Sequence, residues 1–164
     1  MEQLIVGKSL EMQLAALLDT LSSDATVSYM VTRLNEGEEA TIVASSKETI
    51  VHTGASMVKT LILEYVFHLA AQEQLDLNDT IALSRSPRVE GAGALMELVG
   101  NHSFSYLELC RLMMVLSDNW ATNLLIQALG MENINARAEQ LGLEHFEINR
   151  MMMDFTAVKE NREN

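Results

Sequence analysis

The stretch TGASMVKTLILEYVF, residues 53–67, decides how the rest of the chain is interpreted. Apolar residues recur at helical spacing after Gly54, and they predict a helix over residues 56–73. Ser56 and Lys59 lie three positions apart at the start of this helix, so they share one face. A serine hydroxyl becomes a nucleophile when a base takes its proton, and a neutral amine one turn away can be that base.

This pair alone is a weak signal, because Ser-x-x-Lys occurs in many helices with the serine as a cap and the lysine in solvent. A second polar group, Ser117-Asp118-Asn119, interrupts the apolar segment MMVLSDNWATNLL. Capping of the following helix by Asp118 or Asn119 is one explanation of the break. Apolar residues flank it on both sides, however, so its polar side chains need partners within the core. The amine of Lys59 and a substrate amide are the candidate partners.

Composition and charge exclude several classes of protein. The chain has 164 residues, 48% of them hydrophobic, which fits one domain or part of one. Its net charge of -12 repels phosphate backbones and anionic lipid, so no nucleic-acid partner is expected. No window approaches the roughly 18 apolar residues of a membrane helix, so no membrane insertion is expected. The chain as written carries no signal peptide, which predicts a cytoplasmic protein unless an export segment has been removed.

Metal and redox chemistry find no support in the pattern of cysteine and histidine. Cys110 lies in the apolar run LELCRLMMVL, where a buried packing role is expected. His68, His102 and His145 lack the mutual spacing of a metal site. We therefore expect no cofactor and no metal.

The periodicity of the whole chain predicts an α+β fold. Alternating patterns at residues 26–34 and 40–45 predict a β-hairpin, and a further strand-like run follows at 49–53. The segment 83–95 holds the only proline and two glycines, which predicts an extended surface connection. Apolar spacing and capping residues predict helices at 3–21, 56–73, 105–116 (opened by a capping box of Ser105 and Glu108), 119–129 and 132–141.

These segments together resemble the class A β-lactamases and penicillin-binding proteins, a family of serine hydrolases. The resemblance covers nearly the whole chain and lies in GASMVK, GAGAL, SYLELCRLMMVLSDNWATNLLI and LGLEHFEINRMMMD. It implies a truncated β-lactamase/transpeptidase-like fold that lacks the late strands and the closing helix. The chain would be the N-terminal portion of one such domain: a helix and hairpin at 1–53, a helical part at 54–145, and the start of the omega-loop region at 146–164.

The resemblance also implies a role for each site residue. Ser56 would be acylated by a β-lactam or a D-alanine-like acyl substrate, with its backbone N–H as half of the oxyanion hole. Lys59 would exchange the proton of Ser56, and Ser117 would relay a proton toward the leaving nitrogen. Asn119 would bind the amide side chain of the substrate and help to orient Lys59. Structural roles are implied for the remaining two residues, Asp118 and Arg150.

Two departures from the family pattern bear on function. No lysine of the chain is followed by Ser or Thr and then Gly, so the third motif of the family is missing, and His52-Thr53-Gly54 is interpreted as a strand exit with a turn glycine. The family's deacylating glutamate, two residues after the omega-loop arginine, is replaced by Met152. Because methionine cannot act as a base, poor deacylation is expected unless Asp154 substitutes.

Four interpretations therefore remain open. The first is a serine hydrolase of β-lactamase type that acts on a small β-lactam or a peptidoglycan-like substrate. The others are a penicillin-binding or sensing module, a catalytically silent truncated homologue, and a serine-dependent glutaminase. Without the late strands the hairpin would have unpaired edges, so we also expect self-association or pairing with a missing C-terminal segment.

Overall fold

The computed structural model describes residues 9–21, 24–34, 36–37 and 39–159. These residues fall into two compact units whose boundary in the sequence lies between His52 and Thr53. The first unit contains α1 (Leu10–Leu18), β1 (Tyr29–Arg33) and β2 (Thr41–Ser46). The second contains α2 (Val58–Ala71), β3 (Thr80–Ala82), β4 (Ser103–Ser105), α3 (Tyr106–Val115), α4 (Asn119–Leu129), α5 (Met131–Gln140) and α6 (Phe155–Lys159). The assignment of both parts to one domain stays a prediction.

The first unit is built on the predicted hairpin. β1 and β2 pair antiparallel from Tyr29 opposite Ser46 to Arg33 opposite Thr41, with one irregularity after Val31. The strand predicted at 49–53 is wrong, because these residues join no ladder in the described part of the chain. Pairing of the hairpin with another copy or another segment stays a prediction.

The helix of the first unit differs from its prediction in burial. Ser9 caps α1 by accepting the backbone N–H of Met12 at 3.4 Å. The apolar spacing at 3–21 is typical of a helix with one buried face, yet Leu10, Leu17 and Leu21 are 40%, 61% and 48% exposed. Apolar spacing predicted a helix over 3–21, of which 10–18 are helical and 3–8 lie outside the described residues. Within the described residues, nothing covers the apolar face of this helix fully.

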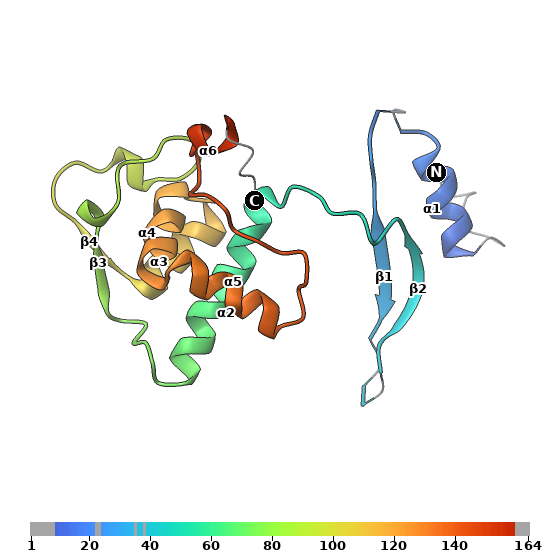
Figure 1. Cartoon of the computed structure of the whole chain (residues 1–164), viewed down its shortest axis with the longest axis horizontal. Helices are drawn as coiled ribbons and strands as arrows, with labels where there is room; N and C mark the ends of the chain where they lie inside the picture. Colours follow the sequence, from blue (N-terminus) through green and yellow to red (C-terminus); the bar gives the residue numbers. More distant parts are fainter. Residues whose placement is uncertain (1–8, 22–23, 35, 38, 160–164) are drawn as a thin grey trace. The chain divides into compact units, whose positions relative to one another are not determined.

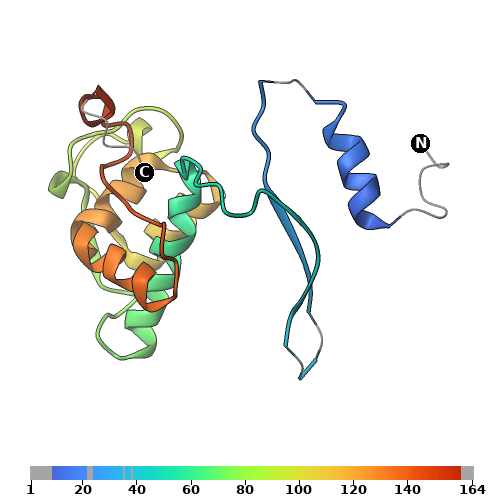
Figure 2. The same ribbon diagram turned by 45° about the vertical axis from the view of Figure 1, so that its right-hand side comes forward.

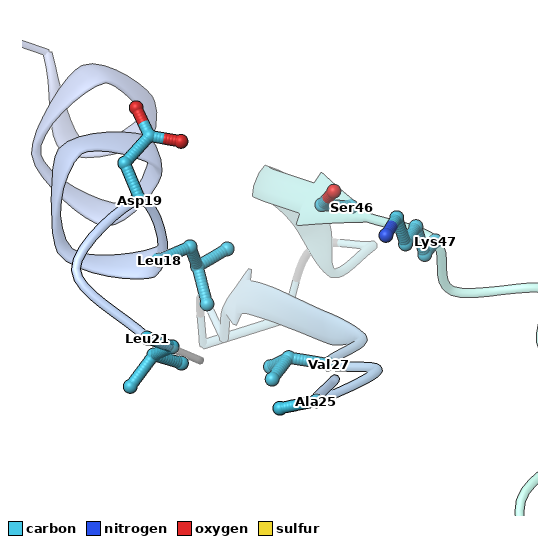
Figure 3. Close-up of a pocket in the computed structure, with 7 residues that line it drawn as sticks. All are labelled: Leu18, Asp19, Leu21, Ala25, Val27, Ser46 and Lys47. Atoms are coloured by element: carbon cyan, nitrogen blue, oxygen red, sulfur yellow. The ribbon is translucent and has the colours of Figure 1, made fainter. Parts of the chain in front are cut away.

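A cavity of about 370 Å³ lies between the end of α1 and the hairpin. Figure 3 shows Leu18 and Leu21 at the helix side of this cavity, with Ser46 and Lys47 at the end of β2. The remaining lining residues are Asp19, Ala25 and Val27. None of the predicted site residues lines it.

The second unit holds the main hydrophobic core. Figures 1 and 2 show α2, α3, α4 and α5 packed together, with the short strands β3 and β4 at the edge of this helical group. Side chains from all four helices are fully buried in the core, among them Ile62, Val66, Leu109, Met113, Leu124 and Ile134. Cys110 is also buried here, and burial raises the pKa of its thiol to about 11, which agrees with the predicted packing role.

Helix starts in the second unit follow the predicted capping residues. The Ser105 hydroxyl accepts the Glu108 backbone N–H at 3.2 Å, and the Glu108 carboxylate accepts the Ser105 backbone N–H at 2.8 Å. This is the predicted capping box. The segment after the apolar helices was not predicted to have a cap, yet Asp154 accepts the Ala157 backbone N–H at 3.0 Å at the start of α6.

The connection between α2 and α3 is more ordered than predicted. β3 and β4 form a two-stranded antiparallel sheet, and single 3₁₀ turns at Leu83–Arg85 and Leu95–Glu97 lie between these strands in the sequence. Leu83 and Leu95 are buried, so the predicted surface connection at 83–95 is wrong in part. Strands of three residues are too short to produce an alternating pattern in sequence. None of the helices in the described part of the chain has the length and apolar character needed to cross a membrane.

Candidate active site

The start of α2 carries the first predicted motif. A 3₁₀ turn, η2 (Ala55–Met57), leads directly into the helix, so Ser56 precedes Lys59 by one helical turn. Gly54 was predicted as the turn glycine, but its φ is negative. The residue with a positive φ in this turn is Ala55, at +43°. Ser56 is exposed, whereas the side chain of Lys59 runs into the protein and is only 3% exposed.

The amine of Lys59 meets the second predicted motif. Its Nζ lies 2.8 Å from the carbonyl oxygen of Ser117, 2.8 Å from the Ser117 Oγ and 3.1 Å from the Asn119 Oδ1. Lys59 is thus joined by hydrogen bonds to two predicted site residues, Ser117 and Asn119, which lie 58 and 60 positions later in the sequence. Within the described residues, no hydrogen bond is found for the Ser56 hydroxyl.

Burial and charge act in opposite directions on Lys59. Burial lowers the pKa of the amine below its ordinary value of 10.5, and the negative charge of Asp118 partly offsets this shift. The folded protein therefore loses this proton at a lower pH than the unfolded chain. Stability consequently rises with pH between the two pKa values, because the unfolded chain binds more protons there. The same shift increases the population of the neutral amine that a base requires.

The partners of Lys59 suit a neutral amine. The Ser117 carbonyl and the Asn119 Oδ1 can only accept hydrogen bonds, and a neutral amine has two N–H groups to donate to them. Its lone pair then remains available to a hydroxyl proton. The Ser117 hydroxyl is already within 2.8 Å, and the Ser56 hydroxyl is one helical turn away. The amine is thus in direct contact with one hydroxyl group, that of Ser117, and it follows the other candidate hydroxyl, that of Ser56, by one turn of the chain.

Asp118 holds the loop of the second motif in place. It is 1% exposed, and its Oδ1 accepts the Ala121 backbone N–H at 2.9 Å as the N-cap of α4. Its Oδ2 accepts the backbone N–H groups of Ala94 and Leu95 at 2.7 and 2.8 Å. The preceding residue, Ser117, has a φ of +53°, which turns the chain sharply between α3 and α4. The carboxylate thus ties two separate segments to one point.

The glycines of GAGAL make this close approach possible. Gly91 and Gly93 have φ values of +107° and +126°, where L-residues are strained. A Cβ at Gly93 would lie 2.3 Å from the carboxyl carbon of Asp118, and one at Gly91 would lie 2.8 Å from the Asn119 Nδ2. The Asn119 backbone N–H donates to the carbonyl of Ala92 at 3.0 Å. The segment therefore packs directly against the loop that holds Lys59.

Two asparagines fix the segment around Arg150, and sequence reasoning missed both. Asn123 exchanges two hydrogen bonds with the backbone of Met152, at 2.7 and 3.1 Å. Asn135 does the same with Ile148, at 2.8 and 3.0 Å. The signal that could have found Asn123 is its position in the apolar run ATNLLI, because a polar side chain in such a run needs a buried partner.

Of the three methionines after Arg150, only Met153 is found beside the GAGAL segment within the described residues, while Met151 and Met152 pack against the hydrophobic core. The Met153 side chain lies beside Gly91, with its terminal methyl 3.3 Å from the position of a Cβ at that glycine. Arg150 is half-buried, and its Nη1 donates to the carbonyl of Met151 at 3.4 Å. Asp154 points one oxygen to the Ala157 N–H as the cap of α6. Its capping role weakens the idea that Asp154 replaces the missing base.

Comparison with known proteins identifies the family. The model of the beta-lactamase enzyme family (Beta-lactamase2) matches residues 9–164, so the chain belongs to this family of β-lactamase-type serine hydrolases. A curated relative, the β-lactamase BRO-1 of Moraxella catarrhalis, is 31% identical over 97 residues, which is 55% of this chain and 31% of that protein.

Solved structures agree with this assignment and with the predicted α+β fold. The structure of PBP-A superposes with a TM-score of 0.73 at 25% identity, over 91% of this chain and 56% of that one. A PBP-A variant, solved as an acyl-enzyme complex with penicillin G, superposes with a TM-score of 0.74 at 27% identity. The match covers 89% of this chain and 54% of that one. A β-lactamase from Sphaerobacter thermophilus superposes with a TM-score of 0.65 at 27% identity, over 75% of this chain and 45% of that one. The chain thus spans about half the length of these solved proteins.

The contact between Gly93 and Asp118 yields a stability prediction. We expect Gly93→Ala to lower the free energy of unfolding by more than about 2 kcal/mol, because the new Cβ meets the carboxylate and the backbone is also strained. Gly142→Ala is the matched control, since Gly142 has a φ of +76° but open space around its Cβ position. Urea denaturation compares the two variants. Equal losses of stability would show that the contact with Asp118 is unimportant.

Proposed function

We propose that Ser56 is the nucleophile of this chain and that a β-lactam or a similar acyl donor acylates it. The Ser56 Oγ attacks the carbonyl carbon while Lys59 takes its proton, and the carbon–nitrogen bond of the lactam then breaks. Ser117 passes a proton from Lys59 to the leaving nitrogen, which balances the charge. The observation that carries this proposal is the buried amine of Lys59, held by Ser117 and Asn119 one turn from an exposed serine.

Substrate binding and positioning are assigned to the remaining residues. Asn119 accepts from Lys59 through its Oδ1, which leaves its Nδ2 as a donor for a carbonyl of the substrate side chain. Asp118 positions Ser117 and Asn119 through its three backbone contacts, and Arg150 is assigned a structural role in the segment that follows. The acyl-enzyme complex of the PBP-A variant with penicillin G supports a penicillin as the first substrate to test.

A long-lived acyl-enzyme is the second part of the proposal. A carboxylate base that activates water contributes about 100-fold or more to hydrolysis, and Met152 offers none. The capping contact of Asp154 supports this expectation. The slow release of the acyl group favours a penicillin-binding or sensing role over rapid turnover. A catalytically silent chain is the competing outcome, because the chain spans only about half of its solved relatives.

Acylation is tested with a fluorescent penicillin and intact-mass measurement. We expect the full chain to gain one penicillin, and peptide mapping to place it on Ser56. Ser56→Ala should abolish the adduct, while Ser103→Ala, which removes an exposed hydroxyl on β4, should leave it unchanged. An adduct on another residue would contradict the assignment of Ser56. A folded chain that forms no adduct would favour the silent interpretation.

Deacylation is tested at Met152. We expect Met152→Glu to shorten the lifetime of the adduct by at least about tenfold, because it supplies a base. The hydrogen bonds from Asn123 hold the backbone of this residue in either variant. Met152→Gln is the matched control, since it has nearly the same shape and cannot act as a base. Mass spectrometry over time measures the loss of the adduct. Equal lifetimes in the two variants would overturn the explanation for slow release.

A further inference from the structure

A second cavity, of about 280 Å³, lies in the helical unit at the end of the β3–β4 sheet. Its walls come from the residues after β3, from the residues before and at the start of β4, and from Trp120 in the first turn of α4. Figures 1 and 2 show β3 and β4 at the edge of the helical group. None of the residues proposed for acylation lines it.

Hydrogen bonds hold the walls of this cavity together. Ala82 pairs with Ser103 in the sheet, and the Leu83 backbone N–H donates to the His102 carbonyl at 2.9 Å. Two other lining residues are also joined, since the indole Nε1 of Trp120 donates to the carbonyl of Ser86 at 3.2 Å. The cavity is therefore formed before any ligand enters, which lowers the entropic cost of binding.

The charge of the lining is unusual for this chain. The protein has 23 acidic residues against 11 Lys and Arg, yet among the residues that the structure describes no Asp or Glu lines the cavity. Arg88 does line it, and within the described residues the guanidinium of Arg88 takes part in no ion pair or hydrogen bond. An exposed guanidinium with no acidic neighbour in the cavity is a suitable partner for a carboxylate, which it can bind through two parallel hydrogen bonds.

The other lining groups suit a flat molecule with polar edges. Trp120 is half-buried, and because its N–H is already bonded to Ser86 it offers the ligand only its ring. Aromatic rings bind flat apolar groups by stacked or edge-on contact. The hydroxyl groups of Ser84 and Ser103 and the amide of Asn101 provide further hydrogen-bonding groups at the rim. The volume is near the lower limit for small-molecule sites, so it fits a single ring.

We propose that this cavity binds a small planar carboxylate, with Arg88 pairing with the carboxylate and the Trp120 ring contacting the planar group. Such a site is separate from the Ser56 site and does not depend on acylation. Its ligand would be recognised by one negative charge and one flat ring, and benzoate is the simplest probe with both features.

The single tryptophan allows a direct test in the full chain. In a nitrogen–proton correlation spectrum, Trp120 gives the only indole N–H signal, and we expect benzoate to shift it with a millimolar dissociation constant. Benzamide, which has the same ring and no charge, should bind at least about tenfold more weakly, the loss expected for one charge-assisted contact. Arg88→Gln should weaken benzoate binding by a similar factor.

Two controls separate this site from other effects. Arg111→Gln removes an exposed arginine from α3 and should leave benzoate binding unchanged. Ser56→Ala should also leave it unchanged, so that failure of the acylation proposal and failure of this proposal remain distinguishable. Equal binding of benzoate and benzamide, unchanged binding in Arg88→Gln, or an indole signal that does not move as benzoate is added would each overturn the proposal.

Discussion

The buried carboxylate of Asp118 is the constraint on which the site depends. A carboxylate that is almost fully buried is costly unless it is paired, and Asp118 accepts three backbone N–H groups from two segments. These bonds fix the start of α4 and hold the GAGAL loop against it. The positions of Ser117 and Asn119 follow, and with them the acceptors of the Lys59 amine. The same negative charge stabilises a protonated Lys59, while burial of that amine favours the neutral form.

Burial of the Lys59 amine and the charge of Asp118 together determine how readily this amine loses its proton. A fully exposed lysine would stay charged at neutral pH and could not take a proton from a serine. Burial brings the amine closer to the neutral form, and the acceptors from the 117–119 loop hold it in a defined place. The acylation that we propose for Ser56 would use this amine as its base. The release step has no equivalent support, since Met152 stands two residues after Arg150 and Asp154 caps α6.

Sequence could predict the features that depend on local spacing. The capping box at Ser105 and the N-cap at Asp118 follow from residue type and position, and so do the bounds of α3, α4 and α5 to within a residue or so. The approach of Lys59 to residues 117–119 was predicted from two motifs and their resemblance to a family. Features that depend on distant partners were missed. The short β3–β4 pair carries no periodic signal, and the hydrogen bonds of Asn123 to Met152 join residues 29 positions apart. Spacing also indicates that α1 has an apolar face, but not whether anything covers that face.

The central claim is that the fold holds Lys59 as an amine of lowered basicity against the Ser117 hydroxyl, one helical turn after Ser56. Nuclear magnetic resonance titration of the lysine side chains tests it directly, with the Lys59 signal assigned from its absence in Lys59→Arg. The chain has four lysines, so the signals can be resolved individually. The structure predicts a Lys59 midpoint below the ordinary value of 10.5. A midpoint at or above that value in the folded protein would contradict the account.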